Sequence, residues 1–418
     1  MLKAIKGFHD ILPGEVEKWQ FVEAKARKIF EEFGFSEIKI PIAERTELFT
    51  RSIGETTDIV EKEMYTFPDR NGELITLRPE ATASVARAYI EHRLYENARV
   101  AKLYCIGPMF RHEKPQRGRY RQFHQINVEV LGTASPVMDA EIMAMLNHFL
   151  TETGVGPVEL QINNLGCSNC RVRYRNELRG FLVGKSSDLC ADCQRRIDTN
   201  PLRIFDCKNK VCQDITSSAP NILEYVCSGC SKNFEDVGRN LERLGALYRI
   251  NPRLVRGLDY YTRTAFEVIT DKLGTQNAVA AGGRYDGLIK DLGGLDIPGL
   301  GFAVGLERVV ALISEEESFS SQPYVFIASL GSAAKDEALQ LANRLRLKGI
   351  KTEMDYEESS LKSQMRWANK LKTKFVIIIG DEELAKGSVI LRDMKDQRQE
   401  EVELERVIEE VTVRREIT

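Results

Sequence analysis

Hydrophobic and polar residues alternate with a helical period near the start of the chain and with a strand period directly after it. Apolar side chains recur three or four positions apart over residues 15–33 and Gly34 follows them, so we expect a helix that ends at this glycine. Residues 35–41 (FSEIKIP) alternate apolar and polar side chains and predict a strand. The alanine-rich residues 80–91 come directly after Pro79 and predict a second helix, because proline is favoured at helix starts.

Two longer apolar segments, residues 100–106 and 123–131, flank a charged loop that contains glycine. Two strands joined by such a loop form an antiparallel hairpin. Strand and glycine patterns return at residues 256–268 and 282–288, and residues 299–313 predict a strand (GLGFAVG) that leads into a helix (LERVVALI). These patterns predict a domain in which helices accompany an antiparallel sheet.

The last block, residues 323–418, has a different pattern, in which buried apolar strands alternate with amphipathic helices. The segments YVFIASL, IKTEM and KFVIIIG predict strands, and helices are expected between them, up to about residue 347 and over residues 361–371. Such alternation predicts βαβ units and a parallel or mixed sheet. An acidic, serine-rich linker at residues 314–322 separates this block from the rest of the chain.

The bulk composition restricts the class of protein only weakly. Apolar residues make up 43% and charged residues 29% of the 418 positions, which is typical of a globular chain with a large core. The net charge of -3 excludes a uniformly basic binder of nucleic acid, and we expect no DNA partner, but local basic patches can still hold RNA. The chain shows neither the apolar region of a secretory signal nor an apolar run near ~18 residues, so we expect a cytoplasmic protein without membrane contact.

Eight of the nine cysteines fall within residues 166–236, a polar stretch with little apolar periodicity. They form four close pairs: Cys167/Cys170, Cys190/Cys193, Cys207/Cys212 and Cys227/Cys230. In a reducing compartment such pairs indicate metal ligands rather than disulfides, and their spacings offer up to two tetrahedral zinc sites of four cysteines each. The alternative is that reduced cysteines simply pack inside a helical insertion.

The sharpest local feature is the basic loop that follows Phe110. Between positions 111 and 121 it contains five arginines and lysines and His112, against a single acid, Glu113. Guanidinium groups bind phosphoryl oxygens through two parallel hydrogen bonds, so the loop suits phosphate or an RNA backbone. Charge alone leaves a solvated surface loop as the alternative.

The residues of this loop also resemble a known family. Residues 111–113 (RHE) followed by 121–123 (RQF) resemble motif 2 of the class II aminoacyl-tRNA synthetases, and residues 305–308 (GLER) resemble motif 3. Pro41, inside the predicted strand before residues 47–49 (ELF), resembles motif 1. Each of these class motifs is degenerate when it is taken alone.

Two narrower stretches identify the member of the class. Residues 256–262 (RGLDYYT) and 281–286 (AGGRYD) are similar to the histidine-specific signatures of the bacterial histidyl-tRNA synthetases. The order and spacing of all the motifs hold from Gly7 to the end of the chain, so the resemblance covers nearly the whole sequence. Their joint occurrence is far more specific than any one of them.

The resemblance implies that the chain binds ATP with Mg²⁺ and forms histidyl-adenylate. The carboxylate of histidine attacks the α-phosphorus of ATP, and preorganised cations at that point stabilise the transition state. Arg111 matches the motif 2 arginine on the α-phosphate and Arg256 matches the extra arginine of the histidyl family, so these two are the expected catalytic residues. The residues expected to bind ATP are Arg111, Glu113, Arg119, Phe123 and Arg308.

Recognition of histidine requires acceptors for the α-ammonium group and partners for both ring nitrogens. By resemblance Glu80 and Thr82 bind the amino group with Gln125 beside them, and Glu129 and Tyr261 surround the imidazole. The remaining residues expected at histidine are Ala81, Arg111, Arg256, Tyr260 and Tyr285. Taken singly, the tyrosines could be core residues, and Glu80 could merely favour the dipole of a helix start.

The resemblance implies an α/β fold class: an α+β catalytic domain with an antiparallel sheet, a small and mainly helical cysteine-rich insertion, and an α/β anticodon-binding domain with a mixed sheet. The expected domains are residues 1–165 and 237–313 for the two parts of the catalytic core, 166–236 for the insertion, 314–322 for the linker and 323–418 for the anticodon-binding domain. Zinc is not typical of the family, which keeps the alternative of packed, reduced cysteines open. From the cysteine spacing, our hypothesis is that this insertion holds structural zinc and contacts the tRNA acceptor arm.

The implied partners are tRNA(His), L-histidine and ATP, together with a second copy of the chain, because motif 1 of class II enzymes forms a two-fold interface. The main rival is a non-catalytic, synthetase-like regulatory subunit of histidine biosynthesis. Such proteins usually lose phosphate-binding arginines and the anticodon domain, whereas Arg111, Arg256 and Arg308 and a C-terminal α/β block are present here. A threonyl or prolyl enzyme and a pure RNA-binding module are further alternatives, and the histidyl signatures argue against both.

Overall fold

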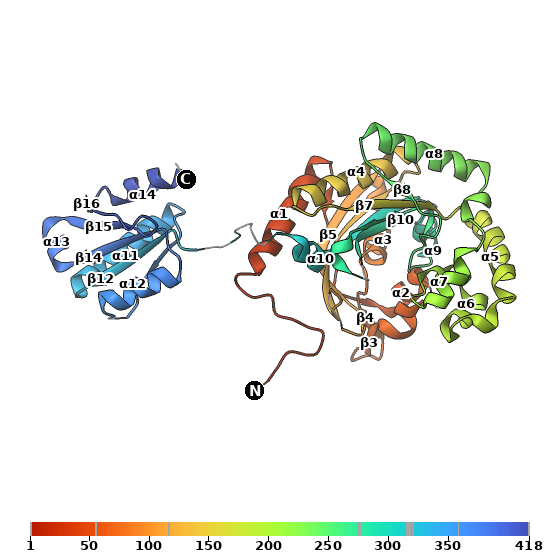
Figure 1. Ribbon diagram of the computed structural model, residues 1–418, viewed down its shortest axis with the longest axis horizontal. Helices are drawn as coiled ribbons and strands as arrows, with labels where there is room; N and C mark the ends of the chain where they lie inside the picture. Colours follow the sequence, from red (N-terminus) through yellow and green to blue (C-terminus); the bar gives the residue numbers. More distant parts are fainter. Residues whose placement is uncertain are drawn as a thin grey trace. The chain divides into compact units, whose positions relative to one another are not determined.

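The computed structural model describes residues 2–54, 57–115, 118–274, 277–314, 319, 322–357 and 359–416 (Figure 1). The chain divides into two compact units, Met1–Ser318 and Phe319–Thr418. Each unit has its own sheet and its own buried apolar core. Among the described residues, no helix has both the length and the apolar character needed to span a membrane.

An eight-stranded sheet in the order β1-β5-β6-β11-β10-β9-β7-β8 forms the centre of the first unit. All neighbouring strands from β5 to β7 are antiparallel, whereas the two-residue edge strands β1 and β8 pair in parallel. The sheet is built from β1 (Ser36–Glu37), β5 (Ala101–Phe110), β6 (Gln122–Leu131), β7 (Glu159–Asn164), β8 (Arg249–Ile250), β9 (Thr262–Ile269), β10 (Ala278–Arg284) and β11 (Gly299–Gly305). The predicted hairpin is confirmed as β5–β6, and the predicted antiparallel sheet is confirmed with it.

Helix α1 (Val16–Glu32) confirms the first predicted helix, and its apolar stripe is buried against the sheet. Phe30, fully buried, packs edge-on against Tyr104 of β5 with 5.4 Å between ring centroids and also contacts Phe302 of β11. Burial of a side chain of this size contributes about 1.5–3 kcal/mol. Helices α4 (Pro136–Glu152) and α10 (Leu306–Leu312) contact α1, and α10 confirms the predicted strand–helix junction after β11.

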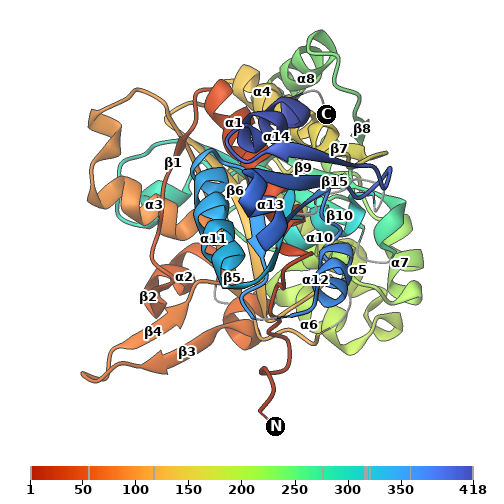
Figure 2. The same ribbon diagram turned by 90° about the vertical axis from the view of Figure 1, so that its left-hand side faces the viewer.

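The predicted strand at residues 35–41 is wrong for most of its length. Only β1 pairs with β5, and the chain leaves the sheet before Pro41, which lies in no strand and has no N–H for a ladder. The chain then enters β2 (Ala43–Arg45), which joins a separate three-stranded sheet with β3 and β4. Figure 2 shows the β3–β4 hairpin projecting from the unit; these strands span Tyr65–Pro68 and Leu74–Leu77.

Two other sequence predictions need new bounds. Residues 256–261 are irregular and β9 begins only at Thr262, while β10 begins earlier than expected, at Ala278, and α9 (Leu288–Asp291) follows it. The second predicted helix is α3 (Thr82–Glu91), which contacts α2 (Thr46–Ile53). The irregular segment bonds to the cysteine-rich insertion instead of to a neighbouring strand, as described below.

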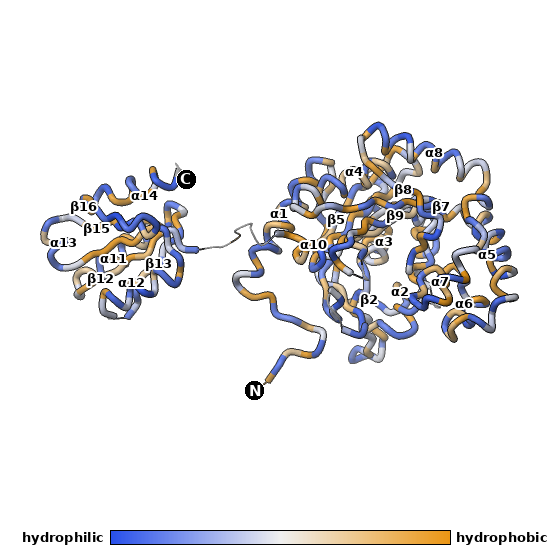
Figure 3. The backbone as a smooth tube through the Cα atoms, viewed as in Figure 1, coloured by the Kyte–Doolittle hydropathy of each residue, from blue (hydrophilic) through white to orange (hydrophobic). Residues whose placement is uncertain are grey.

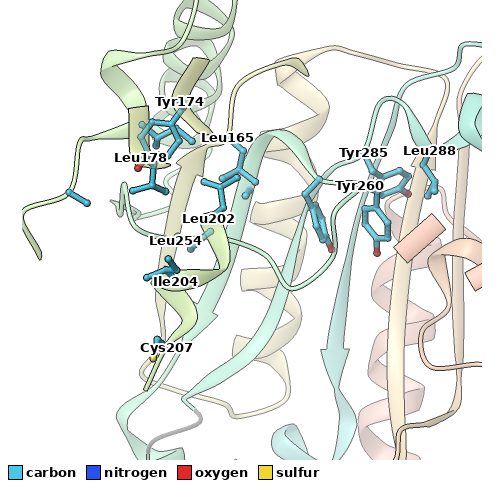
Figure 4. Close-up of a cluster of buried hydrophobic side chains, with 14 of the residues drawn as sticks. Leu165, Tyr174, Leu178, Leu202, Ile204, Cys207, Leu254, Tyr260, Tyr285 and Leu288 are labelled. Atoms are coloured by element: carbon cyan, nitrogen blue, oxygen red, sulfur yellow. The ribbon is translucent and has the colours of Figure 1, made fainter. Parts of the chain in front are cut away.

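The cysteine-rich insertion is mainly helical, as predicted. It contains α5 (Ser168–Val183), α6 (Ala191–Thr199), α7 (Lys210–Ser217) and α8 (Ser228–Arg243), with short 3₁₀ helices between them. Helix α8 continues beyond residue 236 and packs on α4. The buried side chains of the insertion form one cluster with Leu254, Tyr260 and Tyr285 of the sheet region (Figure 4).

The second unit contains a five-stranded mixed sheet in the order β13-β12-β14-β15-β16. The first three strands are parallel and the last two pairings are antiparallel, as a mixed sheet requires. Its elements are β12 (Val325–Leu330), α11 (Ser332–Leu347), β13 (Thr352–Met354), α12 (Leu361–Lys370), β14 (Phe375–Gly380), α13 (Asp381–Lys386), β15 (Ser388–Asp393), β16 (Gln399–Glu403) and α14 (Val407–Glu416). Hydrophobic colouring concentrates on the inner strands in Figure 3. Most of the predicted linker lies outside the described residues.

Candidate active site

A cavity of about 310 Å³ lies over the middle of the eight-stranded sheet. Its floor is a row of paired positions that crosses four strands: Asn127 of β6 pairs with Ala303, Ala303 with Ala281, and Ala281 with Glu267 of β9. The two central residues are alanines, whose side chains are short, and longer polar side chains project from the sheet at both ends of the row. The sheet therefore forms a trough with a small-residue base.

Strand β6 supplies a second line of polar groups along its length. Side chains two residues apart share a face of a strand, so Gln125, Asn127 and Glu129 face the same side. Gln125 Oε1 and Asn127 Nδ2 are buried and have no hydrogen-bond partner among the described residues. Buried polar atoms normally have partners, so these two atoms mark positions for a ligand or water.

Gly301 of β11 pairs with Glu129 and keeps space for its carboxylate. A Cβ atom at this glycine would overlap both Glu129 Oε2 and the carbonyl oxygen of Val128. The backbone of β11 can therefore approach β6 only because this position has no side chain.

Glu129 does not line the cavity itself but bonds to Thr82, which does, and it is almost completely buried. Its carboxylate accepts hydrogen bonds from Thr82 Oγ1 at 2.6 Å and from the hydroxyl of Tyr285. Burial, reinforced by the nearby Glu80, raises the pKa of Glu129 to about 8, although the two hydroxyl donors oppose this rise. The group is thus a proton-sensitive acceptor near neutral pH.

Glu80 serves the start of helix α3 and the cavity at once. Its two carboxylate oxygens accept hydrogen bonds from the backbone N–H groups of Thr82 and Ala83, each at 2.8 Å. A carboxylate at this place satisfies free N–H groups of the first turn and is favoured by the helix dipole. Glu80 also lines the cavity, so the same side chain can both stabilise the start of the helix and contact a ligand.

Three tyrosines form the wall beyond Glu129. The ring centroids of Tyr260 and Tyr261 are 4.7 Å apart, and those of Tyr260 and Tyr285 are 5.6 Å apart. Tyr260 and Tyr261 line the cavity, whereas Tyr285 lies one layer deeper. Burial raises the pKa of each of the three hydroxyl groups, so all of them remain neutral donors at ordinary pH.

The basic loop between β5 and β6 brings cations and an acid to the opposite end of the cavity. Arg111 donates from Nε to the carbonyl oxygen of Pro79 at 2.9 Å, and its guanidinium group lies 5.3 Å from the centroid of the Phe123 ring. Glu113 is 3.1 Å from Arg119 Nη1 and 3.9 Å from Arg111 Nη1. Arg117 of the same loop lies outside the described residues.

Arg256 enters the cavity from the irregular segment before β9. Its Nη1 lies 3.4 Å from Glu267 Oε1, and its guanidinium group lies 5.5 Å from the centroid of the Tyr261 ring. Burial opposes the positive charge, but Tyr261, Glu267 and Asp206 outweigh burial and raise the pKa of Arg256. The side chain is therefore a fixed, permanently charged cation.

Arg308 comes from the first turn of α10 and donates from Nη1 to the carbonyl oxygen of Ala278. Burial and the neighbouring positive charge of Arg119 lower the pKa of Arg308. An anion between these arginines would relieve both effects. Glu307, the residue before it, accepts hydrogen bonds from the backbone N–H of His124 at 2.8 and 3.1 Å, and so joins α10 to β6.

The cavity gathers eleven of the fourteen side chains predicted for ATP or histidine. The three that do not line it are Ala81, Glu129 and Tyr285, which are buried directly beneath it. Asn127, Glu267 and Glu307 line the cavity but were missed by the sequence prediction. The alternation along β6 could have indicated Asn127, because it lies between two predicted residues on the same face.

Comparison with known proteins decides the family. The histidyl-tRNA synthetase family model matches residues 7–309, and the anticodon-binding domain model matches residues 324–414. A histidine–tRNA ligase of Geobacter sulfurreducens is 56% identical over 404 residues, which is 97% of this chain and 98% of the relative. The chain belongs to the histidyl-tRNA synthetase family.

Solved structures of histidyl-tRNA synthetases have the same fold. The S. aureus enzyme, determined without ligands, superposes with a TM-score of 0.83 at 36% identity and covers 98% of this chain and 100% of its own. A Bacillus halodurans protein described as an ATP phosphoribosyltransferase regulatory subunit/histidyl-tRNA synthetase has a TM-score of 0.68 at 20% identity, covering 91% of this chain and 98% of its own. At that identity the likeness shows the fold alone.

The cysteine-rich insertion of this synthetase-family chain holds two separate groups of thiols. Cys167, Cys170, Cys227 and Cys230 form one group, and Cys190, Cys193, Cys207 and Cys212 form the other. In each group the four Sγ atoms lie within 4.8 Å of one another, and all eight cysteines are free. Cys105, the ninth, is buried in β5 and belongs to neither group. Either group could hold a metal ion.

Proposed function

We propose that the chain activates L-histidine with ATP to histidyl-adenylate and transfers the histidyl group to the 3′ end of tRNA(His). One observation carries this proposal. Arg111, Arg256 and Arg308 come from three separate elements and line a single cavity, and the same cavity is lined by Glu80 and Gln125, whose oxygens can accept hydrogen bonds from an amino acid. The full-length similarity to histidine–tRNA ligases supports the same reaction.

Adenylate formation brings two anions together, the carboxylate of histidine and the α-phosphate of ATP. Arg111 and Arg256 are proposed to hold the α-phosphate from two sides, because negative charge accumulates on its oxygens when the carboxylate attacks. Both side chains already have partners that fix their directions, Pro79 for Arg111 and Glu267 for Arg256. Cations that are oriented before the reaction stabilise the transition state without further reorganisation.

The α-ammonium group of histidine is proposed to bind near Glu80, Thr82 and Gln125. Gln125 Oε1, which has no partner among the described residues, is available to accept a hydrogen bond from the ammonium group. Tyr261 and the Glu129 carboxylate are proposed to bond the imidazole nitrogens, with Tyr260 and Tyr285 closing the wall. Polar groups that stay unpaired with a wrong amino acid discriminate by factors of ~10⁴ or more.

The outer phosphates and the adenine are proposed to lie at the other end of the cavity. Phe123 and Arg308 would enclose the adenine ring, and Arg119 and Arg308 would contact the outer phosphates, whose charge would offset the repulsion between these cations. Mg²⁺ enters with ATP as part of the substrate and supplies charge neutralisation. Glu113 and Glu267 both line the cavity and are the carboxylates that we propose for Mg²⁺.

The C-terminal unit is proposed to bind the anticodon of tRNA(His), and the whole reaction is assigned to the cytoplasm, where tRNA is charged for protein synthesis. We further propose a homodimer, because motif 1 of class II enzymes normally forms a two-fold interface. Sedimentation velocity at micromolar concentration tests this assembly: a dimer is expected, and a monomer would contradict it.

The alternative is a regulatory subunit that binds histidine without activating it. The three cavity arginines argue against this alternative, since a protein that only senses histidine does not need side chains that bind phosphate. An ATP–pyrophosphate exchange panel with histidine, threonine, proline and glycine separates the possibilities. Exchange that depends on histidine alone is expected; binding of histidine without exchange would favour the regulatory role instead.

Structural zinc is proposed for the cysteine-rich insertion, since its donor sets fit the ion. The thiolate ligands in question are Cys167, Cys170, Cys190, Cys193, Cys207, Cys212, Cys227 and Cys230. The insertion is also proposed to face the acceptor arm of the tRNA. Zinc here would supply folding energy and take no part in the chemical step.

A further inference from the structure

The thiol geometry fits one tetrahedral ion at each of two places, which we name cluster A (Cys167, Cys170, Cys227, Cys230) and cluster B (Cys190, Cys193, Cys207, Cys212). The Sγ atoms of Cys167 and Cys170 are 3.5 Å apart, and those of Cys190 and Cys207 are 3.8 Å apart. A tetrahedral zinc ion with Zn–S distances of about 2.3 Å separates its sulfur ligands by roughly 3.8 Å. Disulfide bonds would require about 2.05 Å instead.

The local structure repeats at three of the four cysteine pairs. Cys167, Cys190 and Cys227 each stand at the N-cap of a helix, and the second cysteine of each pair lies in the first turn. Backbone N–H groups also point at sulfur: Cys227 N–H donates to Cys170 Sγ at 3.0 Å, and Cys190 N–H donates to Cys212 Sγ at 3.3 Å. Such donors stabilise thiolates, the form that binds metal.

The pairing of the clusters is nested along the chain. Cluster A joins the first cysteine pair to the last, and cluster B joins the two pairs between them. Cluster A therefore ties the start of α5 to the start of α8, at the base of the insertion. Cluster B ties the start of α6 to α7 and to the short 3₁₀ helix at residues 201–206.

We propose that both clusters bind structural zinc and that the insertion, once it is held by these ions, positions the histidine-recognition segment at residues 256–261. This inference rests on the proposed function for the role of the segment, but not for the metal. The segment lies in no strand or helix of its own. Its backbone must therefore be fixed by neighbours.

Helix α5, which begins at cluster A, holds the end of the segment. Arg171, one residue beyond Cys170, donates from Nη1 to the carbonyl oxygens of Asp259 at 3.1 Å and Tyr261 at 2.9 Å. The N–H of Arg263 donates to the carbonyl oxygen of Gly166 at 2.9 Å, directly before the first cysteine. Gly166 and Arg171, on either side of Cys167 and Cys170, are thus bonded to the chain both before and after Tyr260.

The 3₁₀ helix at residues 201–206, which ends at Cys207 of cluster B, and Asn200 before it hold the start and the middle of the segment. Arg203 donates from Nη1 to the carbonyl oxygen of Arg256 at 3.5 Å, and Asn200 donates from Nδ2 to Asp259 Oδ1 at 2.7 Å. Arg203 also forms an ion pair with Asp58 at 3.5 Å. The carbonyl group of Arg256, the proposed catalytic arginine, is therefore bonded by Arg203, which lies in the helix that ends at Cys207.

Apolar packing continues the same connection. Leu165, Leu202, Leu254 and Tyr260 belong to one buried cluster with Cys193, Cys207 and Cys212, and Figure 4 shows the row of side chains from the insertion to the tyrosines. A helical insertion of this size has a small core of its own, and structural metal compensates for a small core. Loss of the ions should therefore loosen the segment as well as the insertion.

Metal analysis tests the first half of the proposal without reference to activity. Full-length protein purified without chelator is expected to contain two zinc ions per chain by elemental analysis. Cys227→Ala and Cys190→Ala should each reduce the content to one, whereas Cys105→Ala, a thiol outside both clusters, should leave two. A wild-type content of one zinc or less after zinc-supplemented expression, or iron in place of zinc, would overturn the assignment of zinc to both clusters.

Kinetics test the second half. Cys227→Ala is expected to raise the KM for histidine roughly tenfold, which is a typical effect of removing a residue that supports a site from outside. The KM for ATP should change little. Cys227→His should restore both the second zinc and the KM, because histidine is a common zinc ligand. Arg171→Met should raise the KM for histidine with two zinc ions still bound.

The outcomes are separable. An unchanged KM for histidine in Cys227→Ala with one zinc lost would overturn the positioning role and keep the metal sites. A normal zinc content in a wild-type protein that catalyses no histidine-dependent exchange would overturn the proposed function and keep the metal sites as well. Failure of Cys227→Ala to fold is covered by Arg171→Met, which leaves all eight thiols in place.

Discussion

Thr82 Oγ1 donates a 2.6 Å hydrogen bond to Glu129, and this bond joins the start of helix α3 to strand β6 beneath the cavity. The backbone N–H of the same threonine is held by Glu80. The group proposed for the ammonium end of histidine and the group proposed for its imidazole end are therefore linked through one side chain.

Replacement of Arg256 should separate binding from chemistry. In Arg256→Ala we expect histidine to bind with similar affinity, while histidine-dependent ATP–pyrophosphate exchange falls by orders of magnitude, because the cation acts mainly in the transition state. Exchange kinetics together with calorimetric titration of histidine measure the two effects. Arg249→Ala, a change at an exposed arginine, is the control. A wild-type exchange rate in Arg256→Ala would refute the role.

Glu129 should make stability depend on pH. Its folded-state pKa of about 8 lies above the ordinary value of 4.5, because the group is buried, so the folded state binds one more proton between these two pH values. Stability falls with rising pH wherever the folded state holds the extra proton, at about 1.4 kcal/mol for each pH unit. Relative to Glu129→Gln, which cannot ionise, the wild type should lose free energy of unfolding between pH 5 and pH 8. Urea unfolding at several pH values measures this difference, and parallel curves would contradict it.

Gly301 should tolerate no side chain. Gly301→Ala would force a methyl group against Glu129 and the carbonyl of Val128, and we expect a loss of roughly 1–3 kcal/mol in unfolding free energy together with a higher KM for histidine. Gly180→Ala in α5 is the matched control, since nothing lies within 4 Å of a Cβ atom there. The control should be neutral or slightly stabilising, because alanine favours a helix. Equal thermal shifts in the two variants would disprove the steric argument.

The signature arginine Arg284 should be structural. Its side chain and that of Asp139 are fully buried and lie 2.5 Å apart. Asp139→Ala leaves a buried cation without its main partner and should cost about 3–5 kcal/mol. Asp296→Ala removes the partner of Lys290 in an exposed pair and should cost at most about 1 kcal/mol. Chemical unfolding of both variants compares them; similar losses would show that burial does not decide the effect.

Sequence patterns predicted the elements whose side chains carry a clear period. The β5–β6 hairpin and α1 were predictable because apolar residues recur at strand or helix spacing over ten or more positions. The predicted strand at residues 35–41 was wrong for most of its length, since local alternation cannot say which strand will pair with it, and the pairing with β5 ends at Glu37. Strands β15 and β16 were not predicted individually. β16 is polar and exposed at a sheet edge, so it shows no apolar pattern.

The candidate site was predictable where a charged side chain belongs to a recognisable motif, as Arg111 and Arg256 do. Glu267 was missed because it lies inside an ordinary strand, and only the register across β9, β10 and β11 brings it opposite Asn127. The pairing of the cysteines could not be read from spacing either. Four pairs can combine in three ways, and only the fold selects the nested one.

The nested order of the clusters sets a sequence of assembly for a chain that is made from its N-terminus. All four thiols of cluster B have been synthesised before Cys227 and Cys230 exist, so under the zinc proposal the inner group would be able to bind an ion while the outer one is still incomplete. Cluster A would then close the base of a subdomain that has already formed. Strand β9 and the tyrosines follow in the chain and would pack on a surface that is already folded.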